Sequence, residues 1–334
     1  MTMVSSGDLA QSLLLKSHTA RLKGELGRLT QEFAAGRVSD VGATLNGDLT
    51  RLTSVSRART MTAGYQSAAR EASSHSAAMQ SALKTIAETS GSLVGPLLTA
   101  SQLNTEDSVA LTGVDARGRL DAVLATMNIS AGGRSLFSGQ ALDQPSVAGA
   151  DTILTALRAE LVGAVTAQQA MDRISDWFDD PAGYRALAYQ GGVPLGPVAV
   201  SSTDRVWMGV TAEDPAFRAM LKGMTAAALL DDPATPLPAT ETKTLARLSA
   251  ETLLAGNEAM ITLAAQLGIS EGRIEAAQSR NAVDLLAQEM AQADLVRSDP
   301  ERLAIELEAV QTNLESVYAI TARLSRMSLT DFLR

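Results

Sequence analysis

The sequence predicts a mostly α-helical fold, with long terminal helices that form an elongated helical bundle or coiled coil and a small mixed α/β middle domain. Three observations predict it. Apolar residues repeat at heptad-like spacing near both ends, hydrophobic residues are 46% of the 334 residues while aromatic residues are only 3%, and the middle contains short β-prone runs among glycine and proline. Ala, Leu and Val therefore supply most of the apolar surface, which suits close helix packing better than a β-sandwich.

Residues 1–47 are expected to form an N-terminal coiled-coil helix followed by a turn. The apolar residues of this helix step by seven, four, three and four positions, which places them on one helical face. They are Leu15, Leu22, Leu26, Leu29 and Phe33. Gly36 is expected to end the helix, because glycine is the preferred residue just after a helix terminus.

Residues 48–135 are expected to form the first half of a helical rod. One helical pattern runs over residues 48–89. A second begins at Thr105, an N-cap residue type that is followed by two carboxylates where they favour the helix dipole. This helix is expected to end at the pair Gly132-Gly133.

Residues 136–238 are expected to form a variable middle domain. One or two short helices are predicted over residues 151–180, and a small β-hairpin from the runs 198–200 and 205–210. A further short helix is expected to begin at Asp214-Pro215, since proline is tolerated in the first helical turn. Residues 231–239 have the composition of a linker.

Residues 239–297 are expected to form the return half of the rod, and residues 298–334 a C-terminal coiled-coil helix. Ser298 is expected to cap the last helix, with Glu301 completing a capping box. The apolar residues of this helix step by four, three, four, three, seven and three, the strongest periodic signal in the chain. They are Leu303, Leu307, Val310, Leu314, Val317, Leu324 and Met327.

Two apolar seams at opposite ends of one chain predict a chain that leaves and returns along a single rod. A helix with one apolar stripe cannot bury that stripe alone, so its partner is either the other terminus or a neighbouring subunit. An ordinary intramolecular bundle explains the same pattern. Periodicity does not distinguish these alternatives.

The composition and the motifs argue against catalysis, and they predict that the protein is not an enzyme. The chain has no cysteine, and its two histidines, His18 and His75, have no clustered carboxylate nearby to form a metal site. Ser138 lies in "FSG", which is not a Gly-x-Ser-x-Gly elbow, and "GGVPLG" (191–196) lacks the Lys-Ser/Thr end of a phosphate loop. No catalytic residue, cofactor site or metal site is therefore expected.

The charge and the N-terminal sequence limit the partners. A net charge of −9 argues against nucleic acid or an anionic membrane surface. The first residues lack the basic and apolar regions of a cleaved signal peptide, and no window approaches the ~20 apolar residues of a membrane span. We expect a protein that is not exported by a cleaved signal.

Four segments in order along the chain carry a family resemblance. They are "LGRLTQEFAAGRVSD" (26–40), "GGRSLFSG" (132–139), "GVTAEDPAFRAML" (209–221) and the closing "DPERLAIELEAVQTNLESVYAITARLSRMSLTDFLR" (299–334). Together they resemble the hook–filament junction proteins, a hook-associated type within the bacterial flagellin superfamily.

The resemblance implies a structural subunit of the flagellum, exported unfolded through the flagellar type III apparatus to an extracellular location. It implies self-assembly as a ring, with a neighbouring hook-associated protein, flagellin and an export chaperone as partners, and neither nucleic acid nor membrane. The twelve seam residues are then the assembly interface, completed in part by neighbouring subunits. A true flagellin, the filament subunit, and a cytoplasmic coiled-coil adaptor remain the alternatives.

The resemblance also gives the stretch "GGRSLFSG" a structural interpretation. The glycine pair is expected to mark a helix end, and Leu136-Phe137 to pin the turn onto the rod. Ser138 and Gly139 are expected to shape the backbone without any catalytic role.

Overall fold

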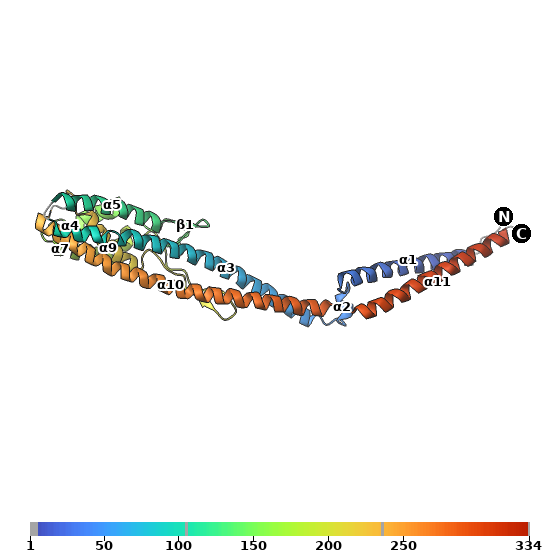
Figure 1. Cartoon of the computed structure of the whole chain (residues 1–334). Helices are drawn as coiled ribbons and strands as arrows, with labels where there is room; N and C mark the ends of the chain where they lie inside the picture. The colour runs from blue at the N-terminus through green and yellow to red at the C-terminus, as the bar shows by residue number, and fades with distance from the viewer. Residues whose placement is uncertain (1–5, 104–105, 235–236, 333–334) are drawn as a thin grey trace. The chain divides into compact units, whose positions relative to one another are not determined.

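The computed structural model describes residues 6–103, 106–234 and 237–332, and long α-helices with two short antiparallel sheets confirm the mostly α fold (Figure 1). The chain divides into two compact units. Unit 1 comprises residues 1–61 and 283–334, and unit 2 comprises residues 62–282. The division into five segments given above stays a prediction.

Unit 1 is built on the two terminal helices, α1 (Ser6–Ala35) and α11 (Pro300–Phe332), which lie side by side (Figure 1). The helix α1 ends where expected, because Gly36 adopts a φ of +65°, a conformation that glycine takes at little cost. The short helix α2 (Val41–Thr44) follows, capped by Asp40, whose side chain accepts a hydrogen bond from the amide of Ala43 at 2.9 Å.

Two backbone hydrogen bonds tie the turn after α1 to residues 296–298, just before α11. The amide of Val38 donates to the carbonyl of Val296 (3.0 Å), and the amide of Ser298 donates to the carbonyl of Gly36 (3.2 Å). The predicted cap at Ser298 is therefore wrong, because that residue is buried in this bridge. Asp299 caps α11 instead, accepting from the amides of Glu301 (3.0 Å) and Arg302 (3.2 Å).

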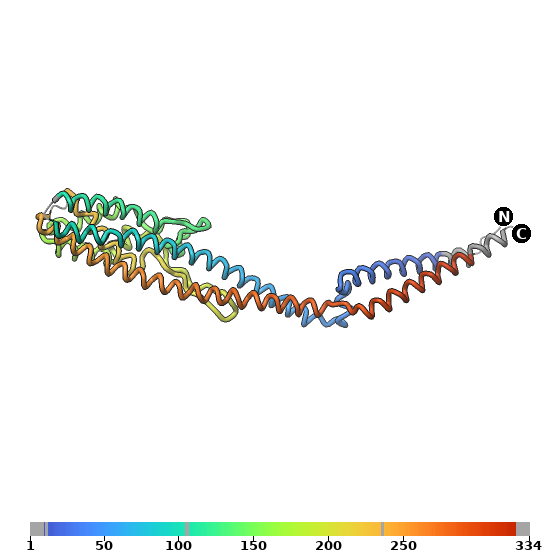
Figure 2. Tube along the Cα trace, viewed as in Figure 1, coloured from blue at the N-terminus to red at the C-terminus, as the bar shows by residue number. Residues whose placement is uncertain are grey.

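Two long helices, α3 (Thr50–Gly91) and α10 (Ala239–Val296), contribute residues to both units. Within unit 2 they run antiparallel, as the cyan and orange traces show (Figure 2). Glutamine side chains join them: Gln80 donates to the carbonyl of Ala264 (2.8 Å) and Gln278 to that of Ala69 (3.0 Å). Neither helix contains proline, so each can continue without interruption.

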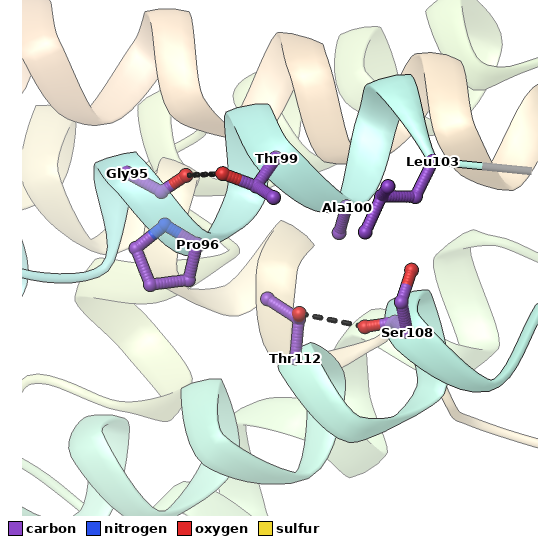
Figure 3. Close-up of a pocket in the computed structure, with 7 residues that line it drawn as sticks. All are labelled: Gly95, Pro96, Thr99, Ala100, Leu103, Ser108 and Thr112. Atoms are coloured by element: carbon purple, nitrogen blue, oxygen red, sulfur yellow. Dashed lines mark hydrogen bonds between the residues drawn. The ribbon is translucent and has the colours of Figure 1, made fainter. Parts of the chain in front are cut away.

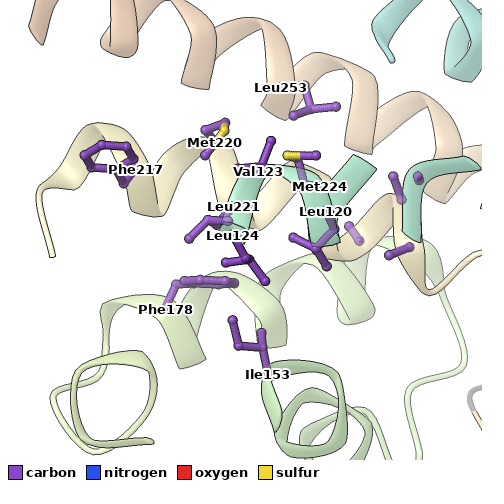
Figure 4. Packing of buried hydrophobic residues seen from close by; sticks show 14 of the residues in the cluster. Leu120, Val123, Leu124, Ile153, Phe178, Phe217, Met220, Leu221, Met224 and Leu253 are labelled. Atoms are coloured by element: carbon purple, nitrogen blue, oxygen red, sulfur yellow. The ribbon is translucent and has the colours of Figure 1, made fainter. Parts of the chain in front are cut away.

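Shorter helices complete the core of unit 2. They are α4 (Val94–Gln102), α5 (Glu106–Met127), α6 (Ala150–Glu160), α7 (Ala167–Asp179), α8 (Tyr184–Leu187) and α9 (Pro215–Ala228). Figure 4 shows Met220 and Leu221 of α9 among apolar side chains of α5, α6, α7 and α10. The predicted start of α9 is confirmed, because Asp214 accepts from the amide of Ala216 at 3.0 Å. The predicted cap of α5, Thr105, lies outside the described residues.

Two hairpins make up the sheets. The strands β3 (Val198–Ala199) and β4 (Arg205–Val206) form the hairpin predicted in the middle of the chain. The strands β1 (Ser130–Ala131) and β2 (Arg134–Ser135) form a second one, turning at Gly132 and Gly133 with φ of +60° and +78°. The glycine pair is therefore a hairpin turn, and the prediction that it ends a helix is wrong: α5 ends at Met127. Two successive positive φ angles are the signature of a two-residue hairpin turn.

The helices α9 and α10 cross at two glycines. A Cβ atom on Gly256 would lie 2.6 Å from the Cα of Met220, and one on Gly223 would lie 2.9 Å from the amide nitrogen of Leu253. Each glycine thus allows the backbone of the other helix to approach closely.

Candidate assembly surfaces

The apolar seams of α1 and α11 pack on each other within one chain. Five seam residues are buried and four more are partly buried against them: Leu22, Leu29, Leu303, Val310 and Val317, then Leu15, Leu26, Leu307 and Leu314. Nine of the twelve predicted interface residues therefore form the core of unit 1. A two-helix core of this kind is what heptad spacing provides.

The other three predicted residues lie differently. The side chain of Phe33 is 52% exposed, outside that core. Leu324 is half-buried, and the side chain of Met327 lies outside the described residues. Contact of any of the twelve with a neighbouring subunit stays a prediction.

A second set of apolar side chains points outward from unit 1, and the seam pattern alone did not identify it. These residues are Leu13, Leu14, Ile305, Tyr318 and Ile320, with exposed fractions from 45% to 70%. A hollow of about 580 Å³ opens beside Leu14 and Ile320. This hollow brings Leu14 and Ile320 together, and adjoining exposed apolar side chains are candidates for contact with another molecule.

A buried carboxylate fixes the turn at the end of α1. Glu32 is 4% exposed, and its Oε1 accepts from Arg28 (2.8 Å) and from the amide of Ser39 (2.9 Å). Burial, the largest single effect, raises the pKa of Glu32, but the hydrogen bonds from Ser39 and Arg28 and the charge of Arg28 outweigh it, so the pKa is lowered. Glu32 thus stays ionised and holds the turn that contacts Val296 and Ser298.

The stretch "GGRSLFSG" lies in the core of unit 2. Phe137 is fully buried and meets Phe217 edge-on at 5.2 Å between ring centroids. The backbone carbonyl of Ser138 accepts from the amide of Gly192 (2.8 Å), while Gly139 has a φ of +61° and leaves no room for a Cβ atom beside the carbonyl of Val193. The Ser138 hydroxyl is buried and has no hydrogen-bond partner among the described residues. These contacts match the expected backbone-shaping role.

The described residues were also compared with what a small ion or a cofactor requires of a binding site. Among the described residues no group of three or more histidine, aspartate or glutamate side chains could hold a metal ion. A pocket of about 480 Å³ between α4 and α5 is lined by neutral residues. Figure 3 shows two of them, Thr99 and Thr112, whose hydroxyls donate to carbonyls of their own helices. In the described part of the chain, no helix is long and apolar enough to cross a membrane.

A more enclosed, mainly apolar hollow of about 430 Å³ lies between α3, the β1–β2 hairpin and residues 195–208; we call it the α3 groove. Ala68 and Ala72 of α3 and Met208 line it, and an ion pair between Glu71 and Arg134 (2.6 Å) lies at its edge. His75 also lines it, and its Nε2 is buried without a hydrogen-bond partner in the described residues.

Burial is the main cause that lowers the pKa of His75, and the charge of Arg134 lowers it further while Glu71 opposes both. At neutral pH His75 is therefore uncharged, and the groove presents an apolar surface with one imidazole.

Comparison with known proteins shows the fold. No protein-family model and no curated protein sequence matches the chain. Among solved structures, the chain is similar to a "putative flagellar hook-associated protein" from Vibrio parahaemolyticus, with a TM-score of 0.54 and 14% identity. The similarity covers 77% of this chain and 98% of that one. At this identity, the shared property is the fold.

Proposed function

We propose that this chain is a structural, non-enzymatic subunit of the bacterial flagellum. One observation carries the proposal: the two ends of the chain pair through apolar seams into unit 1, and that unit keeps a further set of apolar side chains outside. The fold similarity to a hook-associated protein supports the same role.

Within that role, we propose the junction between hook and filament as the position of the protein. The segment "GGRSLFSG" and the order of the four similar segments support this position. Copies of the chain would assemble in a ring through the surfaces of unit 1, between a hook-associated protein and flagellin. Export would use the flagellar type III apparatus and a chaperone, without a cleaved signal peptide.

Localisation and gene deletion test the proposal. Immunogold labelling is expected at the distal end of the hook, and a deletion strain is expected to release filament protein into the medium without attached filaments. Label along the whole filament, with no filament protein made in its absence, would identify a filament subunit instead. A protein found only in the cytoplasm, and never in sheared flagella, would be an adaptor and would refute the proposal.

A surface variant tests the role of unit 1 separately from its folding. Replacing Leu14 and Ile320 with serine changes exposed side chains and leaves the seam core intact. We expect a folded protein that is exported but not incorporated. Val162→Ser, which changes a 75% exposed side chain in unit 2, is the matched control and should be incorporated normally. Normal incorporation of the double variant would exclude this surface from assembly.

A further inference from the structure

The sequence contains one Asn-Gly pair, Asn46-Gly47, and it lies in the turn between α2 and α3, within unit 1. Asn46 has a φ of +52° and Gly47 a φ of +78°, and among the described residues Asn46 is the one non-glycine residue with a positive φ. Asparagine tolerates the left-handed region better than most residues with a side chain, and glycine enters it freely. The conformation of the turn therefore explains this pair of residue types.

An Asn-Gly pair can also modify itself. The backbone nitrogen of the glycine, once a base has removed its proton, attacks the side-chain amide carbon of the asparagine, and ammonia leaves after taking a proton from water, which restores the base. The five-membered succinimide then takes up one water molecule, and one of the two C–N bonds in its ring opens to give aspartate or isoaspartate. Glycine hinders the attack least because it has no Cβ atom beside the nitrogen. Asparagine is accordingly one of the thermolabile residues of proteins.

The structure leaves the side chain of Asn46 open to water. Both Asn46 and Gly47 are exposed, and the described residues provide no hydrogen bond to the Asn46 side chain. Three other asparagines differ, because hydrogen bonds hold the side-chain amides of Asn128, Asn257 and Asn281. Asn46 thus combines the reactive neighbour with a free side chain.

The nitrogen that must react is held by the turn. The N–H of Gly47 donates to the carbonyl of Gly42 at 2.8 Å, and the amide of Asn46 donates to the carbonyl of Ala43 at 3.3 Å. Gly42 belongs to α2, whose first turn is fixed by the carboxylate of Asp40, an acceptor for the amide of Ala43 at 2.9 Å. A base reaches the Gly47 N–H only when its hydrogen bond opens, and short surface elements open locally at a lower free energy than a core does.

We infer that Asn46 is a site of spontaneous deamidation, and that opening of the α2 turn sets its rate. The inference goes beyond the proposed function, since the reaction requires water and no partner. The product carries one more negative charge, in a turn that already contains the carboxylates of Asp40 and Asp48. Isoaspartate also adds one methylene group to the backbone, so the hydrogen bond from Gly47 to Gly42 loses its present geometry. Unit 1 therefore loosens at this turn as the protein ages, while unit 2 does not.

Peptide mapping by mass spectrometry of the aged full chain measures the reaction. Two samples, one folded and one in urea, are kept in mildly alkaline buffer over several weeks. In the folded chain, we expect Asn46 to react more slowly than in urea by about the factor that slows hydrogen exchange of the Gly47 amide, since both reactions remove the same proton. In urea, Asn46 should react at least about tenfold faster than the five asparagines that do not precede a glycine: Asn104, Asn128, Asn257, Asn281 and Asn313.

Two results of this measurement would overturn the inference. If Asn46 reacts in urea no faster than the other asparagines, it is not a special site. If its rate in the folded chain differs in either direction by more than about tenfold from the rate that hydrogen exchange gives, opening of the α2 turn does not set the rate.

A variant of the helix cap tests the control by the turn directly. Asp40→Ala removes the acceptor that fixes the first turn of α2. We expect it to raise both the deamidation rate of Asn46 and the exchange rate of the Gly47 amide by roughly fivefold, the effect of losing one cap. Asp284→Ala removes the same charge from an exposed position of α10 in unit 1 and is the matched control, with both rates unchanged. Equal deamidation rates in the two variants would refute control by the turn.

The consequence for unit 1 is tested with Asn46→Gly, which keeps the left-handed backbone and removes the reactive amide. After ageing, hydrogen exchange at the amide of Ala43 should be faster in the wild-type chain and unchanged in the variant. Exchange in the core of unit 2 should stay the same in both chains. If ageing changes the exchange of Ala43 equally in the two chains, deamidation does not loosen this turn.

Discussion

Replacing Phe137 with alanine should destabilise unit 2 strongly. The side chain is fully buried, in edge contact with Phe217 at 5.2 Å. Truncation of a buried phenylalanine costs about 3–5 kcal/mol through lost burial and the cavity left behind. Loss of the aromatic pair accounts for about 0.5–1.5 kcal/mol of stability beyond burial, so we expect a loss toward the upper end, about 4–5 kcal/mol.

Tryptophan fluorescence during urea unfolding measures this loss in unit 2 alone. The sequence has two tryptophans, Trp177 and Trp207, and both belong to unit 2. With an m-value of about 3 kcal/mol per molar urea, the midpoint should fall by about 1–2 M.

The neighbouring residue provides the matched control. Ser138 is also fully buried, but its hydroxyl has no described partner, so Ser138→Ala removes a desolvated polar group without breaking a hydrogen bond. We expect unchanged or slightly higher stability. The reasoning is refuted if Phe137→Ala shifts the midpoint by no more than Ser138→Ala does, or if Ser138→Ala is the more damaging change.

Three further changes probe other parts of the fold. Glu32→Gln should accelerate hydrogen exchange at the amide of Ser39 near neutral pH. Because the folded pKa of Glu32 is lowered, its contribution to stability is present above the ordinary glutamate pKa of 4.5 and is lost as the pH falls through the folded pKa, so the difference from wild type should shrink in acid. Gly256→Ala should cost about 1–3 kcal/mol in urea unfolding by overpacking, whereas Gly272→Ala, with open space around its Cβ, should stabilise α10 by up to about 1 kcal/mol. Asp299→Ala should cost about 1 kcal/mol, seen as faster exchange in the first turn of α11.

Distinct results would contradict each expectation. A Glu32→Gln variant whose difference from wild type grows in acid would reverse the assigned sign. Equal changes in the free energy of unfolding for Gly256→Ala and Gly272→Ala would show that the crossing of α9 and α10 has room for a Cβ atom at Gly256. Unchanged hydrogen exchange in the first turn of α11 in the Asp299→Ala variant would indicate that Ser298, and not Asp299, caps this helix.

Local sequence rules predicted much of the helical fold. The heptad spacing of Leu303, Val310 and Val317 and the end of α1 at Gly36 are both present in the structure. The cap at Asp214 and the β3–β4 hairpin were likewise predictable, because each depends on a few adjacent residues. Such signals do not require knowledge of distant contacts.

What the sequence did not predict depends on tertiary contacts. The heptad spacing of an apolar seam does not specify which helix packs against it. The pairing of α1 with α11 therefore could not be derived from Leu22 or Leu303. Ser298 is a good cap residue by type, yet its amide pairs with Gly36, far away in the sequence. The α3 groove is formed by three segments that only folding brings together.

The division of the chain into units has a consequence for the order of folding. Unit 2 is one continuous segment, residues 62–282, whereas unit 1 joins the two ends of the chain. If α1 had to find α11 across a flexible segment of that length, loop closure would cost about 5 kcal/mol. Once unit 2 has folded, its antiparallel parts of α3 and α10 already bring the two ends of this segment together, as the hydrogen bond from Gln278 to the carbonyl of Ala69 (3.0 Å) records. Unit 2 can therefore complete its contacts before the ends of the chain pair, which predicts that the terminal helices α1 and α11 close last and open first.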